Sequence, residues 1–145
     1  MSDRQTSQLA TALGKVELFE DLNRKELNFI ANQCRSESFR SGATIVEEGG
    51  ASGRFYLIRS GEVEVLVGRK SVAKMGPNDY FGEMAVIDKA ERSAAVRAVV
   101  DTDVSSLASF NFRALMREHP SIMLKLLIRM CARVRKLDAG MSTAS

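Results

Sequence analysis

The sequence predicts a mostly β protein, a β-roll or jelly-roll barrel with helices at both ends of the chain. Between residues 35 and 109, eight glycines separate short runs of branched and aromatic residues, a pattern typical of strands joined by turns. Outside that stretch, apolar residues recur at helical spacing. The 145 residues have the size of one domain. We therefore expect a single domain over residues 1–145, with helices over about 5–34, the barrel over about 35–109 and helices over about 110–138.

Two short helices are expected before the barrel. Residues 5–14 fit the first. The second begins after Asn23, which can cap it, and Glu26 stands three residues later as the partner in a capping box. Leu27 and Ile30 then follow at helical spacing.

The clearest strand is GEVEVLV, residues 61–67, in which three valines alternate with glutamates and a leucine. A period of two places the valines on one face and the glutamates on the other. The run FYLIRSG, residues 55–61, leads into this strand through a glycine turn. Several such short strands favour a sandwich or barrel.

Two helices are expected after the barrel, over residues 110–118 and 121–137, with an interruption at Pro120. The second carries an apolar stripe at 4-3-4-3 spacing, formed by Met123, Leu127, Met130, Val134 and Leu137. We expect this stripe to pack on the barrel, and a homodimer through the helix is the alternative. The helix is also basic, through Lys125, Arg129, Arg133, Arg135 and Lys136. A solvated basic face is preferred here over an anionic partner or membrane surface.

Composition excludes several classes of function. A net charge of +3 is too small to indicate a nucleic-acid partner, and no apolar run is long enough to span a membrane. The N-terminal segment lacks the apolar core of a signal peptide. Cys34 and Cys131 lie far apart without CxxC spacing, so two reduced, partly buried thiols and a cytoplasmic location are expected.

No metal site, cofactor or catalytic activity is expected. The single histidine, His119, precedes Pro120 and is interpreted as a helix-end residue. One histidine and two cysteines are too few for the usual zinc sites, and no nucleophile motif stands beside the histidine.

The most informative stretch is FGEMAVIDKAERSAAV, residues 81–96. Gly82 allows a ligand to approach the backbone closely, and residues 84–87 can form a helical turn whose free N–H groups attract an anion. Arg92 offers a planar fork for two phosphate oxygens, and Ser93 adds a hydroxyl donor. The small Ala94 leaves the backbone N–H open. Together these features favour one phosphate group.

Glu83 would repel a phosphate unless its carboxylate accepts a hydrogen bond from a nearby hydroxyl, which a ribose supplies. An acid for the sugar and an arginine for the phosphate describe a nucleotide whose phosphate lies close to its ribose. The alternative is a Glu83–Arg92 salt bridge that closes a turn.

Residues 81–98, FGEMAVIDKAERSAAVRA, resemble the phosphate-binding cassette of cyclic nucleotide-binding domains. The resemblance extends to VELFEDLNRKEL (16–27), to GATIVEEGGASGRFYLIRSGEVEV (42–65) and to residues 109–137, so that it covers about 16–137. It implies a β-roll closed by C-terminal hinge and lid helices.

The resemblance also implies roles for single residues. Glu83 and the backbone of Gly82 would hold the ribose 2′-hydroxyl, and Arg92 would pair with the cyclic phosphate. Ser93 and the backbone N–H of Ala85 would complete the phosphate cradle beside Ala94. The remaining positions line the purine and sugar or cap the base: Val65, Val72 and Met84, and Arg133 and Leu137 on the lid helix.

Two departures from the family pattern bear on the base. Ala95 stands where kinase and channel domains often have threonine, and the lid lacks the polar pair with which catabolite-activator-like proteins read adenine. We favour cAMP over cGMP as the ligand.

The expected function is that of a sensor whose helices move to signal to an effector protein or to an effector domain. The alternatives are a degenerate fold that acts as an interaction scaffold, or a site for another purine nucleotide. The chain given ends soon after the last helix, so no DNA-reading helix follows and direct DNA binding is not expected.

Overall fold

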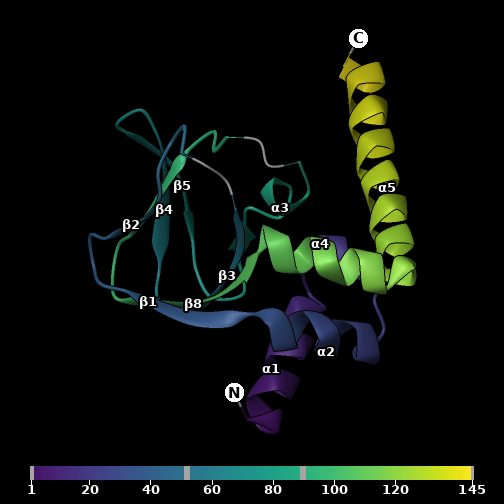
Figure 1. The fold of residues 1–145 in the computed structure, drawn as a ribbon. Helices are drawn as coiled ribbons and strands as arrows, with labels where there is room; N and C mark the ends of the chain where they lie inside the picture. Colours follow the sequence, from purple (N-terminus) through teal and green to yellow (C-terminus); the bar gives the residue numbers. More distant parts are fainter. Residues whose placement is uncertain (1, 51–52, 89–90, 145) are drawn as a thin grey trace.

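The computed structural model describes residues 2–50, 53–88 and 91–144 (Figure 1). The helices are α1 (Asp3–Leu13), the short 3₁₀ helix η1 (Glu17–Phe19), α2 (Arg24–Gln33), α3 (Ala85–Asp88), α4 (Ser109–Glu118) and α5 (Pro120–Ala144). The strands are β1 (Arg35–Phe39), β2 (Thr44–Val46), β3 (Arg54–Ser60), β4 (Val63–Val67), β5 (Lys70–Met75), β6 (Tyr80–Phe81), β7 (Ala95–Ala98) and β8 (Thr102–Ala108).

The strands form two four-stranded antiparallel sheets, in the orders β1-β8-β3-β6 and β2-β7-β4-β5. The helices gather at one side of these sheets (Figure 1). This arrangement confirms the predicted class of a β-roll with flanking helices.

Strand β3 lies between β8 and β6 and is covered on both faces. Tyr56 and Ile58 point into the interior of the roll, where they join Val63 and Val104 in an apolar cluster. Phe55 and Leu57 point to the opposite face and pack in the larger core beneath the helices. This double cover explains why the run Phe55–Ile58 is buried without a polar break.

The turn between β3 and β4 depends on Gly61. Its φ of +96° lies in the left-handed region, and a Cβ there would meet the carbonyl oxygen of Asp101 at 2.6 Å. The predicted alternation after this glycine is only partly kept. Val63 is fully buried, but Val67 is 48% exposed because β4 runs beyond the core toward its hairpin with β5.

The N-terminal helices begin at capping boxes. Asn23 and Glu26 exchange side-chain and backbone hydrogen bonds at the start of α2, as predicted. Ser2 and Gln5 do the same for α1, which runs over Asp3–Leu13 rather than 5–14. Both helices bury apolar side chains in the larger core.

The C-terminal helices meet at His119, which caps the end of α4 before Pro120 begins α5. The ring of His119 stacks on that of Phe29 in α2, with centroids 4.1 Å apart. The helix-end interpretation of the histidine is confirmed. Helix α5 continues to Ala144, beyond the predicted end near residue 138.

The prediction that the apolar stripe of α5 packs on the barrel is wrong. Over residues 120–140 of this helix, Ile122 and Leu126 are the buried residues, and only Met130 of the predicted stripe packs against the core. The other four stripe residues are exposed: Met123, Leu127, Val134 and Leu137. The reason is geometric, since α5 rises beside α4 and away from the sheets (Figure 1).

The basic face of α5 is not simply solvated either. Lys125 Nζ lies 2.6 Å from Glu26 Oε1 of α2, whose carboxylate is buried. Arg129 forms ion pairs of 2.9 Å with both Glu20 and Asp21. These contacts hold the first half of α5 against the N-terminal helices.

Both cysteines are free thiols. Cys34 is half-buried as expected, but Cys131 is exposed on α5. Within the described residues, no helix is both long enough and apolar enough to cross a membrane. No group of three or more histidine, cysteine or acidic residues in that part of the chain could hold a metal ion.

Candidate functional site

The site is built around a close contact between Gly82 and Arg92. Gly82 adopts a φ of +82°, and a Cβ at this position would meet Arg92 Nη1 at 2.5 Å and the carbonyl oxygen of Arg54 at 2.6 Å. The glycine therefore both allows the left-handed turn and leaves room for the guanidinium. Arg92 Nη2 donates a hydrogen bond to that same Arg54 carbonyl.

The guanidinium of Arg92 is only partly satisfied. Its Nε is buried and has no hydrogen-bond partner in the described part of the protein. Burial lowers the pKa of Arg92 below its ordinary value, and the nearby acidic groups of Tyr56 and Glu83 oppose this effect. A partly buried cation with a spare donor is a favourable place for an anion.

Glu83 is mostly buried, with 19% of its side chain exposed. Its Oε1 lies 3.8 Å from Nη1 of Arg133 on α5, and Nε of the same arginine lies 3.9 Å from Glu17 Oε1 of η1. Among the described residues no ion pair joins Glu83 to Arg92, which argues against the interpretation of this stretch as a closed salt bridge.

The predicted helical turn lies at Ala85–Asp88, one residue later than expected. The N–H groups of Ile87 and Asp88 both donate to the carbonyl oxygen of Met84. Val86 is buried in the larger core and anchors the turn. Its carbonyl accepts a hydrogen bond of 2.9 Å from Ser109 Oγ, at the start of α4.

Three neighbouring cavities of about 340, 210 and 220 Å³ share Arg92 in their walls. The second brings together six predicted residues: Gly82, Glu83, Met84, Ala85, Arg92 and Ser93. The third adds Val65 and Ala94 to Gly82, Arg92 and Ser93. The structure thus gathers eight of the eleven predicted site residues around one guanidinium.

Arg133 adjoins this group through Glu83, but Val72 and Leu137 line none of the three cavities. Val72 is 53% exposed because an irregularity in the β4–β5 pairing falls beside it: Val65 pairs with Ala73, but Leu66 pairs with Ser71. Leu137 is 63% exposed on the outer part of α5.

Sequence reasoning missed the apolar walls of the site. Val46, Met75, Phe81 and Val96 line the third cavity, and Tyr56 lines the first. The ring of Tyr56 stacks on Phe81, with centroids 4.9 Å apart. Phe81 directly precedes Gly82, so its position offered a signal. The other walls come together only through sheet pairing. Residues 89 and 90 of the resembling stretch lie outside the described residues.

Comparison with known proteins agrees with this geometry. A family model described as the cyclic nucleotide-binding domain matches residues 36–119. This region includes all of the residues that line the cavities around Arg92 and every strand residue except Arg35. The chain belongs to the cyclic nucleotide-binding domain family.

Members of this family that resemble the chain include two kinase-related proteins. The cAMP-dependent protein kinase regulatory subunit of Colletotrichum orbiculare is 34% identical over 113 residues, which are 77% of this chain and 29% of that protein. The cGMP-dependent protein kinase of Plasmodium berghei is 36% identical over 87 residues, or 60% of this chain and 10% of that one. The chain therefore spans less than a third of either relative.

The fold is also shared with a solved structure, the N-terminal domain of a transcriptional regulator from Streptomyces coelicolor. Its TM-score is 0.83 at 21% identity, with 90% of this chain and 94% of that chain covered. At this level of identity the likeness concerns the fold alone.

Proposed function

We propose that this chain is a cytoplasmic cyclic nucleotide sensor, which binds cAMP in preference to cGMP and is not itself an enzyme. One observation carries the proposal. Arg92 is a partly buried guanidinium with an unpartnered Nε, and it lies against the backbone of Gly82 inside the region that matches the family. A cyclic phosphate would supply the acceptors that the guanidinium lacks.

The surroundings of Arg92 support a phosphate that is attached to a sugar. Ser93 lines two of the cavities beside the arginine and offers a hydroxyl. Glu83, on the other side, is an acceptor for the 2′-hydroxyl of a ribose. Arg133 lies close enough to hold that carboxylate in place and to bring α5 toward the bound nucleotide.

The preference for cAMP rests on the apolar character of the walls. The third cavity is lined by Val46, Val65, Met75, Phe81 and Val96. Guanine carries a carbonyl group at C6, an N–H at N1 and an amino group at C2, whereas adenine carries a single amino group at C6 and so has fewer polar groups to satisfy. Because a buried polar group without a partner costs free energy, apolar walls favour adenine.

The signal would pass from α3 to α4. Val86 and Ile87 offer their carbonyl groups to Ser109 and Arg113 of α4, so closure of the cassette on a phosphate would pull directly on that helix. The nucleotide can shift the helices only by the difference in its affinity for their two positions.

The helices would act on an effector protein or effector domain, and α5 offers a surface for a second copy of the chain. Its exposed face carries a run of apolar side chains: Met123, Leu124, Leu127, Ile128, Val134 and Leu137. A contiguous exposed apolar face of this kind marks an interaction site. We propose a homodimer through this face.

A competition experiment tests the ligand and its base. A fluorescent cyclic nucleotide bound to the chain is displaced by cAMP, cGMP, 5′-AMP and adenosine, and the same mixtures are analysed for hydrolysis. We expect cAMP to displace the probe at the lowest concentration and to remain intact. Displacement by 5′-AMP at equal concentration would contradict a site for cyclic nucleotides, and failure of the fluorescent cyclic nucleotide itself to bind would indicate a scaffold.

A further inference from the structure

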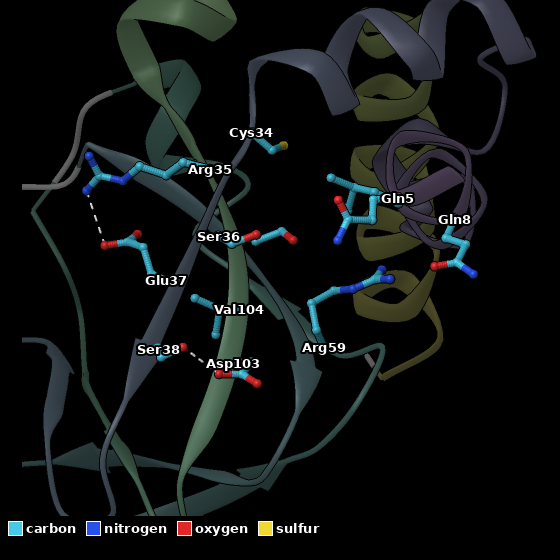
Figure 2. Close-up of a pocket in the computed structure, with 12 residues that line it drawn as sticks. Gln5, Gln8, Cys34, Arg35, Ser36, Glu37, Ser38, Arg59, Asp103 and Val104 are labelled. Carbon is cyan, nitrogen blue, oxygen red and sulfur yellow. Dashed lines mark hydrogen bonds and ion pairs between the residues drawn. The ribbon is translucent and has the colours of Figure 1, made fainter. Parts of the chain in front are cut away.

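A second groove lies on the far side of β3 from the roll interior. Its volume of about 620 Å³ exceeds that of each cavity around Arg92, and it lies between α1 and the strands β1, β3 and β8 (Figure 2). None of the residues assigned to the nucleotide lines it. The groove is thus separate from the site described above.

The floor of the groove is a polar continuation of an apolar surface. Along β3, Phe55 and Leu57 face the helices, and the next residue on that face is Arg59. Along β8, Leu107 is followed on the same face by Ser105 and Asp103. The sheet therefore changes from an apolar core surface to a hydrogen-bonding surface where the helical cover ends.

The two carboxylates in the lining already have partners. Asp103 accepts hydrogen bonds from Ser38 Oγ at 2.6 Å and from Ser60 Oγ at 3.2 Å. Glu37 accepts from Ser106 Oγ at 2.6 Å and pairs with Arg35 at 3.2 Å. Much of the acceptor capacity of the groove is therefore used within the protein.

The groups that remain free are one guanidinium, which can only donate, and hydroxyl and amide groups, which can donate or accept. Within the described residues, the side chains of Arg59, Gln8, Ser36 and Ser105 make no hydrogen bond or ion pair, and Ser105 is buried. Arg59 extends from β3 toward Gln5 and Gln8 of α1 (Figure 2). The carbonyl oxygen of the Gln5 side chain accepts from the backbone N–H of Ser2 at 2.9 Å, which leaves its amino group to donate.

Cys34 also lines the groove, close enough to Arg59 to feel its charge. Burial raises the pKa of this thiol to about 12, and the positive charges of Arg54 and Arg59 act in the opposite direction. The thiol itself stays neutral at physiological pH. The groove is lined by Arg35 and Arg59 as well as by Glu37 and Asp103, so an anion is favoured only where it contacts Arg59 directly.

We propose that this groove is a second ligand site, which binds a small molecule carrying a carboxylate or phosphate group. Arg59 pairs with the oxyanion, and the hydroxyl groups of Ser36 and Ser105 and the amides of Gln5 and Gln8 bind the polar remainder. This second site does not depend on the cyclic nucleotide site, and the two proposals can be tested separately.

The test is a pair of titrations of the full chain followed by ¹H–¹⁵N NMR, one with sodium succinate and one with sodium phosphate, at constant ionic strength. We expect saturable shifts of the amides of Ser36, Arg59 and Ser105, with a Kd of about 1 mM or lower, for one or both anions. The anion that saturates identifies the chemical group. Shifts that grow without saturation, or that appear only around Arg92, would overturn the proposal.

Variants at position 59 separate the site from general charge effects. Arg59→Gln should weaken binding of the anion at least about tenfold. Arg59→Lys keeps the charge but loses the planar fork, so its affinity should lie between those of Arg59→Gln and the wild type. The matched control is Arg69→Gln, which removes an exposed arginine from the β4–β5 turn, and it should bind like the wild type. The dispersion of each spectrum shows that the variant is folded. Equal affinity in the wild type and Arg59→Gln would contradict a role for this arginine.

Discussion

The guanidinium of Arg92 occupies the space that any side chain at position 82 would need. A Cβ built on Gly82 would lie 2.5 Å from Arg92 Nη1, and the left-handed φ of +82° disfavours other residues independently. The position of the anion-binding group and the conformation of the backbone before Glu83 are thus fixed by a single contact.

Gly82→Ala should therefore damage both stability and ligand binding. The left-handed conformation alone costs about 1–2 kcal/mol for a residue with a Cβ, and the overlap with Arg92 displaces the guanidinium as well. Urea unfolding and cAMP titration measure the two effects. Gly68→Ala is the matched control, because Gly68 has a φ of +64° but nothing within 4 Å of the added Cβ. Equal loss of affinity in the two variants would contradict the steric argument.

Glu26→Gln should weaken the attachment of α5 to α2. Glutamine keeps the capping box but loses the charge that pairs with Lys125 at 2.6 Å, so the free energy of unfolding at neutral pH should fall by about 1–3 kcal/mol. Glu118→Gln, at an exposed position on α4, should change it little.

The same carboxylate predicts a pH dependence. Burial acts to raise the pKa of Glu26, but hydrogen bonds from Lys125, Asn23 and Ser121 outweigh it. In the folded protein the pKa of Glu26 therefore lies below its ordinary value of 4.5. Its stabilising contribution is thus present above pH 4.5 and is lost as the pH falls through the lowered pKa. Unfolding measured between pH 7 and pH 3 should show a smaller loss of stability for Glu26→Gln than for the wild type. Parallel curves would rule out this contribution.

Arg133→Gln should reduce the affinity that the ribose 2′-hydroxyl adds to the binding of cAMP. Arg133 lies 3.8 Å from Glu83, so its loss leaves the carboxylate less well held. The affinity for cAMP should fall severalfold, and the affinity for 2′-deoxy-cAMP should fall less. Arg135→Gln, on an exposed part of the same helix, serves as the control. A uniform loss for both nucleotides would mean that Arg133 acts elsewhere.

Ile128→Glu should prevent association through α5. Ile128 is 57% exposed in the middle of the apolar face, and a charge there opposes its burial between two copies. Sedimentation velocity over a range of concentrations should show a dimer for the wild type and a monomer for the variant. Phe110→Glu removes another exposed apolar side chain, on α4, and should leave the dimer intact. A wild-type chain that stays monomeric at every concentration would exclude the dimer.

The sequence predicted the parts of the fold that depend on local chemistry. The capping box of Asn23 and Glu26, the break at Pro120 and the turn before Val63 follow from side chains that act within a few residues. The buried face of α5 could not be predicted in this way. Ile122 and Met123 are both apolar, and only the direction in which α5 leaves α4 decides which one is buried.

The candidate site shows the same division. Gly82, Glu83, Arg92 and Ser93 stand close together in sequence, and the structure keeps them together. Val72 lies outside the three cavities, beside a pairing irregularity in β5 that is invisible in the sequence. The wall formed by Val46 and Val96 arises from pairing between β2 and β7, which lie far apart along the chain.

The most direct measurement is isothermal titration calorimetry of the nucleotide-free chain with cAMP, using Arg92→Ala as the variant and Arg69→Ala as the matched control. Truncation of a desolvated arginine–phosphate pair costs about 2–5 kcal/mol, so Arg92→Ala should bind at least about 30-fold more weakly. The wild type and the control should bind one cAMP per chain with a Kd of about 1 μM or tighter. Unchanged affinity in a folded Arg92→Ala, or no heat from the folded wild type with either cAMP or cGMP, would contradict the central claim that Arg92 holds a cyclic phosphate.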